Sequence, residues 1–205
     1  MSLEPAFQKA KRDMAGIRPY VVAAKSGCHY EGGGFRLAFF NRRFLVSYPE
    51  VRVEEIGGGN PPPMWLQLIL LHYLLTADGT PVADQWLTYR HLPGTALFEQ
   101  RFTNMAIGSL IEAFGHDLAG FRRAALSLGG TSLSRTGDAS FRFLALPRIP
   151  MACILYLGDE EVSPSASILF DAAAPSYLPA EDLSIVGSYL SGSLRGHKGR
   201  AEGEV

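Results

Sequence analysis

The sequence is poor in cysteine, has no excess of charge of either sign and lacks long apolar runs. Its two cysteines, Cys28 and Cys153, cannot form a disulfide framework or an all-cysteine metal site. Its 19 Lys and Arg residues nearly balance its 20 Asp and Glu residues, which gives no general reason to expect binding to nucleic acid or to an anionic membrane. The most apolar stretch, residues 64–75, is too short to span a bilayer. Because Lys9 and Arg12 also interrupt any apolar leader, we predict a soluble, cytoplasmic protein without a nucleic-acid or membrane partner.

Several common signatures of catalysis and cofactor binding are also absent from the sequence. The glycine runs 32–34 and 57–59 do not continue into the Gly-Lys-Ser/Thr or strand-to-helix patterns that hold a phosphate. No Gly-x-Ser-x-Gly motif supports an α/β-hydrolase. The pair Cys28-His29 has no further partners at metal-ligand spacing. We therefore expect no tightly held metal, and the sequence leaves any cofactor unknown.

The segment 140–190 carries the strongest structural pattern. Residues 141–146 and 151–157 are apolar runs typical of strands, and Pro147 and Pro150 frame the reversal between them. A connection this short leaves no room for the helical crossover that parallel neighbours need. We therefore expect these two strands to pair antiparallel.

The helices are predicted from apolar periodicity and from capping residues. Residues 64–75 are apolar nearly all round, which is typical of a central, buried helix. Thr95 suits the N-cap of a long helix that ends at Phe114, and Asp117 suits the N-cap of the next helix. A last helix is expected to begin at about Pro179, a residue favoured in the first turn.

Together these elements predict an α+β fold, with a mainly antiparallel sheet packed against helices, in a single domain over residues 1–195. Residues 196–205 have little apolar content, and we expect them to fray. The order strand, strand, short strand, helix occurs in residues 30–76, where residues 41–43 suggest a hairpin, and again in residues 138–191. An internal duplication would explain this recurrence, and so would chance, because such units are common in α+β proteins.

Three carboxylates follow apolar runs in the C-terminal part of the chain. Asp159 and Glu160 follow the run 151–157, and Asp171 ends the run 168–170. Clustered carboxylate oxygens suit Mg²⁺, and a carboxyl group with a raised pKa suits acid–base catalysis. The alternative is a solvated acidic turn at Asp159 and Glu160, with Asp171 capping a turn.

A second group of candidate residues combines aromatic, cationic and titratable side chains in one short segment. Trp86, Arg90 and His91 belong to it. An aromatic face beside an arginine suits a planar or anionic ligand. The alternative is ordinary packing at the edge of a sheet. His72, on the apolar helix, is interpreted as a core histidine with a satisfied hydrogen bond.

Several longer motifs are shared with a known family. They are His72-Tyr-Leu-Leu with Ala77-Asp-Gly-Thr-Pro, Trp86 with Leu92-Pro-Gly, Phe143-Leu-Ala-Leu-Pro-Arg-Ile-Pro, Gly158-Asp-Glu-Glu, Ile168-Leu-Phe-Asp and Tyr177-Leu-Pro-Ala-Glu-Asp-Leu. Over about residues 27–190, the chain with these motifs resembles the DUF3786 family of bacterial and archaeal domains of unknown function. The positions that belong to the family pattern include Arg148, Asp159, Glu160, Asp171, Glu181 and Asp182.

The resemblance implies a setting for the protein and no catalytic residues. Members of the family are known mostly from anaerobes, and some resemble partners of an iron–sulfur domain or are joined to one. This chain lacks the cysteines for such a cluster. Any cluster would therefore belong to a partner protein.

Two functional hypotheses follow. The favoured one is a module in anaerobic metabolism that binds a small molecule or cofactor, or docks to an iron–sulfur or other redox protein, with Trp86, Arg90, His91 and Arg148 as ligand-binding residues. The alternative is an enzyme that uses the three carboxylates described above, with or without Mg²⁺. Convergence of Asp171 with the turn at Asp159 would favour the enzyme. A cleft lined by Trp86 and Arg90 would favour the binding module.

Overall fold

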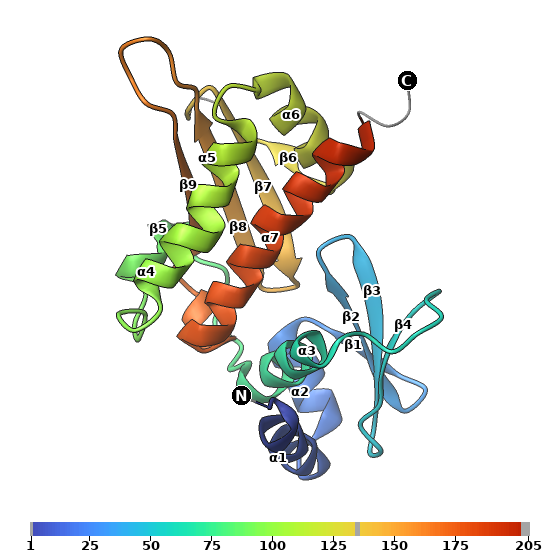
Figure 1. Ribbon diagram of the computed structural model, residues 1–205. Coiled ribbons are helices and arrows are strands. Elements are labelled where there is room, and N and C mark those ends of the chain that lie inside the picture. The colour runs from blue at the N-terminus through green and yellow to red at the C-terminus, as the bar shows by residue number, and fades with distance from the viewer. Residues whose placement is uncertain (1, 134–135, 202–205) are drawn as a thin grey trace.

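The structure, a computed structural model, describes residues 2–133 and 136–201, with side chains as far as residue 198. The fold is α+β, as predicted, and contains a four-stranded and a five-stranded antiparallel sheet (Figure 1). The first sheet comes from the N-terminal part of the chain and the second from the C-terminal part. Within the described residues, no helix is both long enough and apolar enough to cross a membrane.

The N-terminal part combines helices with a sheet of successive hairpins. Its elements are α1 (Glu4–Ala15), α2 (Pro19–Ser26), β1 (His29–Glu31), β2 (Gly34–Phe39), β3 (Arg42–Ser47), β4 (Val53–Glu55) and α3 (Met64–Thr76). The strands pair antiparallel in the order β1-β2-β3-β4. The hairpin predicted around residues 41–43 is confirmed, because β2 and β3 pair across a turn at Phe40 and Asn41.

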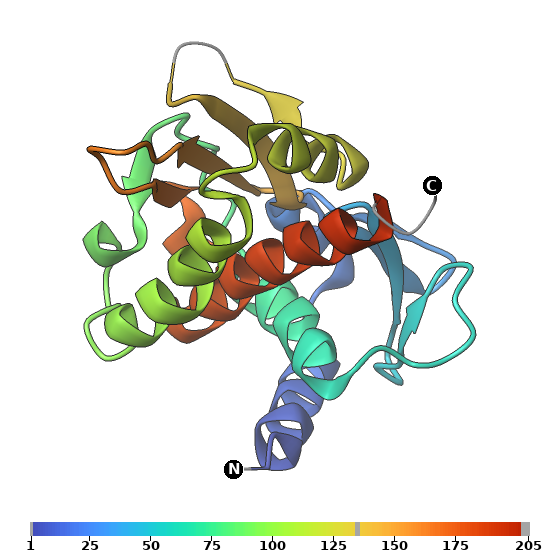
Figure 2. The ribbon, with the colours of Figure 1, turned by 45° about the horizontal axis from the view of Figure 1, so that its top comes forward.

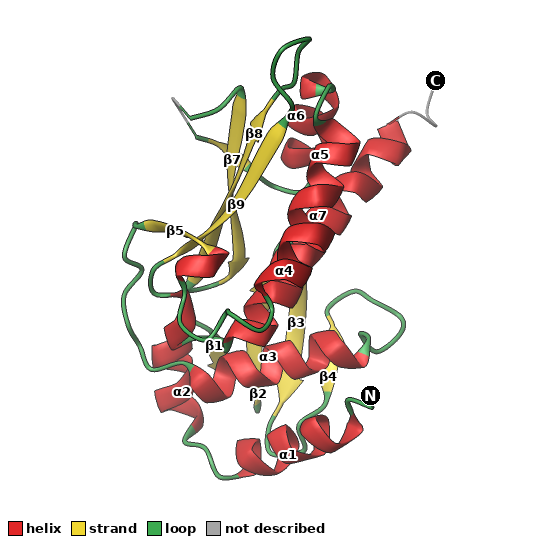
Figure 3. Cartoon of the chain, turned by 60° about the vertical axis from the view of Figure 1, so that its left-hand side comes forward, coloured by secondary structure: helices red, strands yellow, loops and turns green. Residues whose placement is uncertain are grey.

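The C-terminal part places a layer of helices against a sheet. Its strands are β5 (Trp86–Thr88), β6 (Thr131–Ser132), β7 (Ala139–Leu146), β8 (Ile149–Tyr156) and β9 (Ser165–Asp171). Its helices are a 3₁₀ turn (Tyr89–His91), α4 (Glu99–Phe102), a π-helix (Thr103–Ile107), α5 (Gly108–Phe114), α6 (Leu118–Ser127), a second 3₁₀ turn (Ala174–Ser176) and α7 (Ala180–Ala201). The strands follow the order β5-β9-β8-β7-β6, and helices α4 to α7 lie on one side of this sheet (Figure 3).

The predicted antiparallel pairing of the apolar runs 141–146 and 151–157 is confirmed. Strands β7 and β8 form a hairpin in which Phe141 faces Cys153 and Phe143 faces Met151. The turn falls at Pro147 and Arg148, as the two prolines suggested. Strand β8 is buried over almost its whole length because β7 and β9 flank it and helices cover one of its faces.

Helix α3 is the centre of the molecule. It lies between α1 and α7, as Figures 1 and 2 show from two directions. Its residues Leu66, Leu70, Leu71 and Leu74 are fully buried. A helix that is apolar all round must be covered on every side. Both parts of the chain therefore pack around it, and the prediction of a central, buried helix at residues 64–75 is confirmed.

The prediction of one long helix from Thr95 to Phe114 is wrong. The structure divides this segment into α4, the π-helix and α5, and the first helical residue is Glu99. The Thr95 hydroxyl donates to the C=O of Leu92 at 2.9 Å, so it serves the preceding loop and does not cap the helix. The next cap is as predicted: Asp117 Oδ1 accepts the N–H of Gly120 at 2.8 Å at the start of α6.

The C-terminal helix also extends beyond its expected end. Helix α7 continues to Ala201, past residue 196, where the frayed tail was expected to begin, and the fraying stays a prediction. Lys198 explains part of this length. Its Nζ donates to the C=O of Ala113 at 2.6 Å and lies 3.1 Å from Asp117 Oδ2. Residues 202–205 of the expected tail lie outside the described residues.

The recurrence noted in the sequence is visible in the order of elements. Strands β2, β3 and β4 precede α3, and β7, β8 and β9 precede α7. The third strand differs, since β4 has 3 residues and β9 has 7. The shared order alone does not establish a duplication, which stays a prediction, as does the single domain over residues 1–195.

Replacing Leu70 with Asp should unfold the protein. The Leu70 side chain is fully buried in α3, and an unpaired carboxylate there costs several kcal/mol, a large part of the free energy of unfolding of a typical domain. Urea unfolding followed by circular dichroism measures the loss. Leu126→Asp is the matched control, because Leu126 on α6 is 62% exposed. A Leu70→Asp protein with an unchanged midpoint would show that α3 is not the core.

Candidate functional site

Asp159 and Glu160 lie in the turn between β8 and β9, and both side chains are exposed. Asp159 Oδ1 accepts the N–H of Glu161 at 2.9 Å and the N–H of Val162 at 2.8 Å. These hydrogen bonds lower the pKa of Asp159. The carboxylate thus stays ionised and orders its own turn, which matches the alternative reading of a solvated acidic turn.

Asp171 lies at the other end of β9 and is fully buried. Its Oδ1 accepts N–H groups from Ala83 at 3.0 Å and Ala173 at 2.9 Å, as a turn-capping aspartate does. Its Oδ2 has no hydrogen-bond partner among the residues that the structure describes. Antiparallel β9 separates Asp171 from the turn at Asp159 by roughly 20 Å of strand. The structure therefore does not bring the three candidate carboxylates together.

Metal binding has little geometric support in the described part of the chain. There, no group of three or more His, Cys, Asp or Glu side chains is arranged to hold a metal ion. His29 is on β1 and Cys28 precedes it, whereas Asp171 ends β9 in the other sheet and Asp159 lies in the turn before β9. Carboxylates separated in this way do not form a multidentate site for Mg²⁺.

Arg90 lines a cleft between the edge of the five-stranded sheet and the helices. The cleft has a volume of about 210 Å³. Its walls come from the segment after β5, from the α4 and π-helix region, and from β9. The Tyr89 and Phe102 rings beside it are stacked, with centroids 4.4 Å apart. The lining residues are Thr88, Tyr89, Arg90, Glu99, Phe102, Thr103, Ile107, Ala166, Ser167 and Ile168.

The other candidate binding residues lie outside this cleft. Trp86 sits on β5 opposite Asp171 and is partly buried, but it is not one of the described residues that line the cleft. His91 is exposed, with Nδ1 2.9 Å from the Thr88 hydroxyl and Nε2 3.4 Å from Arg90 Nε. The structure thus places His91 beside Arg90 in the 3₁₀ turn, whereas Trp86 lies on β5, the strand that precedes this turn.

Arg148 belongs to a different region, the turn between β7 and β8. Its N–H donates to the Tyr73 hydroxyl at 3.0 Å, and that hydroxyl donates to the C=O of Ser26 at 2.6 Å. A Cβ atom added to Gly27 would lie 3.1 Å from the Arg148 Nε, so the Arg148 side chain packs against Gly27. Arg148 is therefore part of the packing between the two parts of the chain and is not near Arg90.

His72 has the satisfied hydrogen bond that the sequence suggested. Its Nδ1 lies 2.6 Å from Asp182 Oδ2, which joins α3 to the first turn of α7. The partner could not be predicted, because the two residues are 110 positions apart. The pair ties the central helix to the C-terminal one.

Sequence reasoning missed the π-helix beside the cleft. Thr103 and Ile107 belong to it and line the cleft, whereas the periodicity of residues 95–114 suggested one continuous helix. Short π-helical turns occur often at functional sites. Each turn of a π-helix contains an extra residue, and hydrophobic periodicity over a few residues does not resolve that difference.

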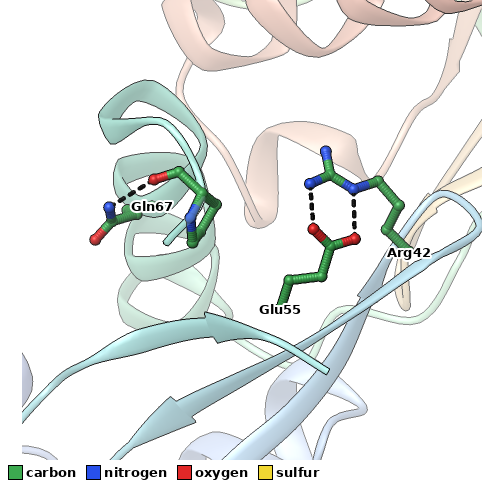
Figure 4. A network of polar contacts seen from close by, with 4 residues as sticks. Arg42, Glu55 and Gln67 are labelled. Atoms are coloured by element: carbon green, nitrogen blue, oxygen red, sulfur yellow. Dashed lines mark hydrogen bonds and ion pairs between the residues drawn. The ribbon is translucent and has the colours of Figure 1, made fainter. Parts of the chain in front are cut away.

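A second, larger cavity of about 530 Å³ lies in the N-terminal part of the molecule. It is lined by residues of α1, β4, α3 and the glycine- and proline-rich loop before α3. Figure 4 shows polar residues of this region: Glu55 pairs with Arg42 through two hydrogen bonds, of 2.8 and 2.6 Å, and Gln67 on α3 donates to the C=O of Pro62. Gly58 and Gly59, from the glycine run excluded above as a phosphate loop, line this cavity.

Comparison with known protein families finds a match over most of the chain. The family model described as "Domain of unknown function (DUF3786)" matches residues 18–193. Neither the curated proteins nor the solved structures include a match to the chain. The matched range takes in β1 to β9 and therefore both sheets, with the cleft beside Arg90 and the strand that borders the N-terminal cavity.

The two thiols should react slowly in the folded protein. Burial raises the pKa of Cys28 to about 11 and that of Cys153 to about 12, so at about pH 8 almost no thiolate is present to attack a disulfide reagent. Titration with dithionitrobenzoate before and after unfolding in guanidinium chloride measures this. Both thiols should react at once in the unfolded chain. Rapid reaction of either one in the native protein would contradict the burial described here.

Proposed function

This chain belongs to the DUF3786 family, and we propose that it is a binding module that holds a planar, anionic small molecule or cofactor in the cleft beside Arg90. The observation that carries the proposal is the position of Arg90, an exposed cation at a cleft whose walls include a stacked pair of aromatic rings. Pockets of this kind combine apolar walls with a few polar groups that orient the ligand.

The apolar walls favour a flat ligand. Tyr89 and Phe102 line the base of the cleft, and Ile107 and Ile168 line it as well. Phe102 and Ile168 are almost fully buried, so this part of the site is supported by the core and does not depend on a mobile loop. A volume of about 210 Å³ lies below the usual range for drug-sized ligands, roughly 300–1,000 Å³, and suits a small ring system.

The polar groups at the rim favour an anion. Arg90 can approach a carboxylate, sulfonate or phosphate with two parallel N–H groups. His91 lies beside it, with its Nε2 3.4 Å from Arg90 Nε. The hydroxyl-bearing residues Thr88 and Thr103 also line the cleft and can bind polar edges of a ring. Glu99, at the same cleft, disfavours a second negative charge on the ligand.

Docking to a redox protein is the second candidate function. The observation that favours it is the exposure of two large apolar side chains of the five-stranded sheet, Leu144 on β7 at 51% and Tyr156 on β8 at 44%. Exposed apolar side chains are used in protein association. The proposed anaerobic, iron–sulfur context comes from the family resemblance, and the proposed cytoplasmic setting comes from the sequence. The carboxylate-dependent enzyme is less favoured, because Asp159 and Asp171 lie far apart.

Replacing Arg90 with Gln should weaken the binding of a planar aromatic anion. With naphthalene sulfonate as the probe, loss of one charge-assisted hydrogen bond should raise the dissociation constant about tenfold or more. Fluorescence titration measures it. Arg101→Gln is the matched control, since Arg101 is an exposed arginine on α4 that does not line the described cleft. Equal losses in both variants, or none in Arg90→Gln, would refute the site.

Naphthalene methanol, an uncharged probe of similar shape, separates the two contributions to binding. Its affinity should not depend on Arg90 and should fall when Ala166→Leu fills the cleft. Native mass spectrometry of protein purified without oxygen would then reveal any natural ligand that copurifies. A retained ligand that is displaced by the sulfonate would support the proposal.

A further inference from the structure

Strand β4 has one side bonded to β3 and the other side turned toward the N-terminal cavity. It is the last strand of the four-stranded sheet in the described part of the chain. The C=O of Arg52 accepts the N–H of Ser47 on β3, and the N–H of Ile56 donates to the C=O of Arg43 on β3. Backbone groups alternate between the two sides of an antiparallel strand. The N–H and C=O of Val53 and the N–H of Glu55 therefore point away from β3.

These outward backbone groups border a groove large enough for another chain segment. Val53 and Glu55 line the cavity of about 530 Å³, which lies within the range of protein binding pockets. The opposite wall is helical, with Phe7 and Lys11 on α1 and Gln67 on α3. An edge strand facing a helix across an open groove is the arrangement in which an extended peptide can add as a further strand.

The groove is held in a defined shape by local contacts. Val51 has φ of 54°, a costly conformation for a β-branched residue, and its N–H donates to the C=O of Ser47 at 3.2 Å. The Glu55 carboxylate is fixed by two hydrogen bonds from Arg42, which also lower its pKa (Figure 4). Strained residues concentrate at binding sites. A preformed groove reduces the entropy cost of binding.

The charges that line the groove select the partner. The charged residues that line it are Lys11, Arg52, Glu54 and Glu55, and because Arg42 neutralises Glu55 the other three leave one net positive charge. Lys11 has its ammonium group 5.7 Å from the Phe7 ring and forms no ion pair within the described residues. We propose that this groove binds an extended peptide segment of another protein, which pairs with the outer side of β4 and places an acidic side chain next to Lys11. The site is separate from the cleft beside Arg90, so neither proposal depends on the other.

The test uses a phage-displayed library of random peptides of about six residues, the usual length of a strand. Peptides selected on the full-length protein are synthesised with a fluorescent label, and their affinity is measured by fluorescence anisotropy. We expect an enrichment of acidic residues among them. Hydrogen exchange of the Val53 and Glu55 amides, followed by NMR, should slow when such a peptide binds.

Val53→Pro removes the outward N–H and leaves the hydrogen bonds to β3 in place, because proline is tolerated on the free side of an edge strand. It should weaken peptide binding about tenfold, the loss expected for one or two backbone hydrogen bonds. Lys11→Glu provides a second variant, at a half-buried position on α1, in case the proline disturbs folding. Lys25→Glu on α2 is its matched control, since Lys25 does not line the groove.

Three results would overturn the proposal. The first is a library that yields no binding peptide. The second is a set of peptides that bind Lys11→Glu and Lys25→Glu equally well. The third is binding that leaves the exchange of the Val53 and Glu55 amides unchanged. Affinity lost in Lys11→Glu, together with slowed exchange at Val53, would support strand addition at β4.

Discussion

The burial of α3 on every side is the constraint on which the rest of the structure depends. A helix with no polar face cannot lie on a protein surface, so each neighbour must cover part of it. Helix α1 covers one side and α7 another, as Figure 2 shows. The few polar groups on α3 then act as fixed connections: Tyr73 bonds to Ser26 and to Arg148, and His72 to Asp182. Each of these bonds joins α3 to a distant part of the chain.

This arrangement explains why the candidate carboxylates lie apart while the cleft beside Arg90 exists. Strand β9 must run the length of β8 to cover it, so a residue before β9 and a residue at its end are necessarily distant. At the same time β5 pairs with only the last part of β9. The first part of β9 is left beside α4 and the π-helix, where Ala166 and Ile168 line the cleft. The length mismatch between two paired strands thus opens the site.

Features set by neighbouring residues could be predicted from the sequence, and features set by distant contacts could not. The β7–β8 hairpin follows from Pro147 and Pro150, and the start of α6 from Asp117, because the cause in each case lies within a few positions. The burial of Asp171 depends on Ala83, which is 88 positions away. Arg90 was identified by residue type alone. Trp86 was grouped with it because the sequence does not reveal that the chain turns between them.

The π-helix between α4 and α5 amounts to a one-residue insertion in an otherwise regular helix. A π-helix winds the chain by fewer degrees per residue than an α-helix, so it takes up one extra residue while the helices on either side keep nearly the same rotation. Deleting one residue there would therefore leave Phe102 on α4 in its place against Tyr89. Relatives of this chain that lack one residue in this segment should keep the same fold and differ only in the part of the cleft wall that Thr103 and Ile107 form.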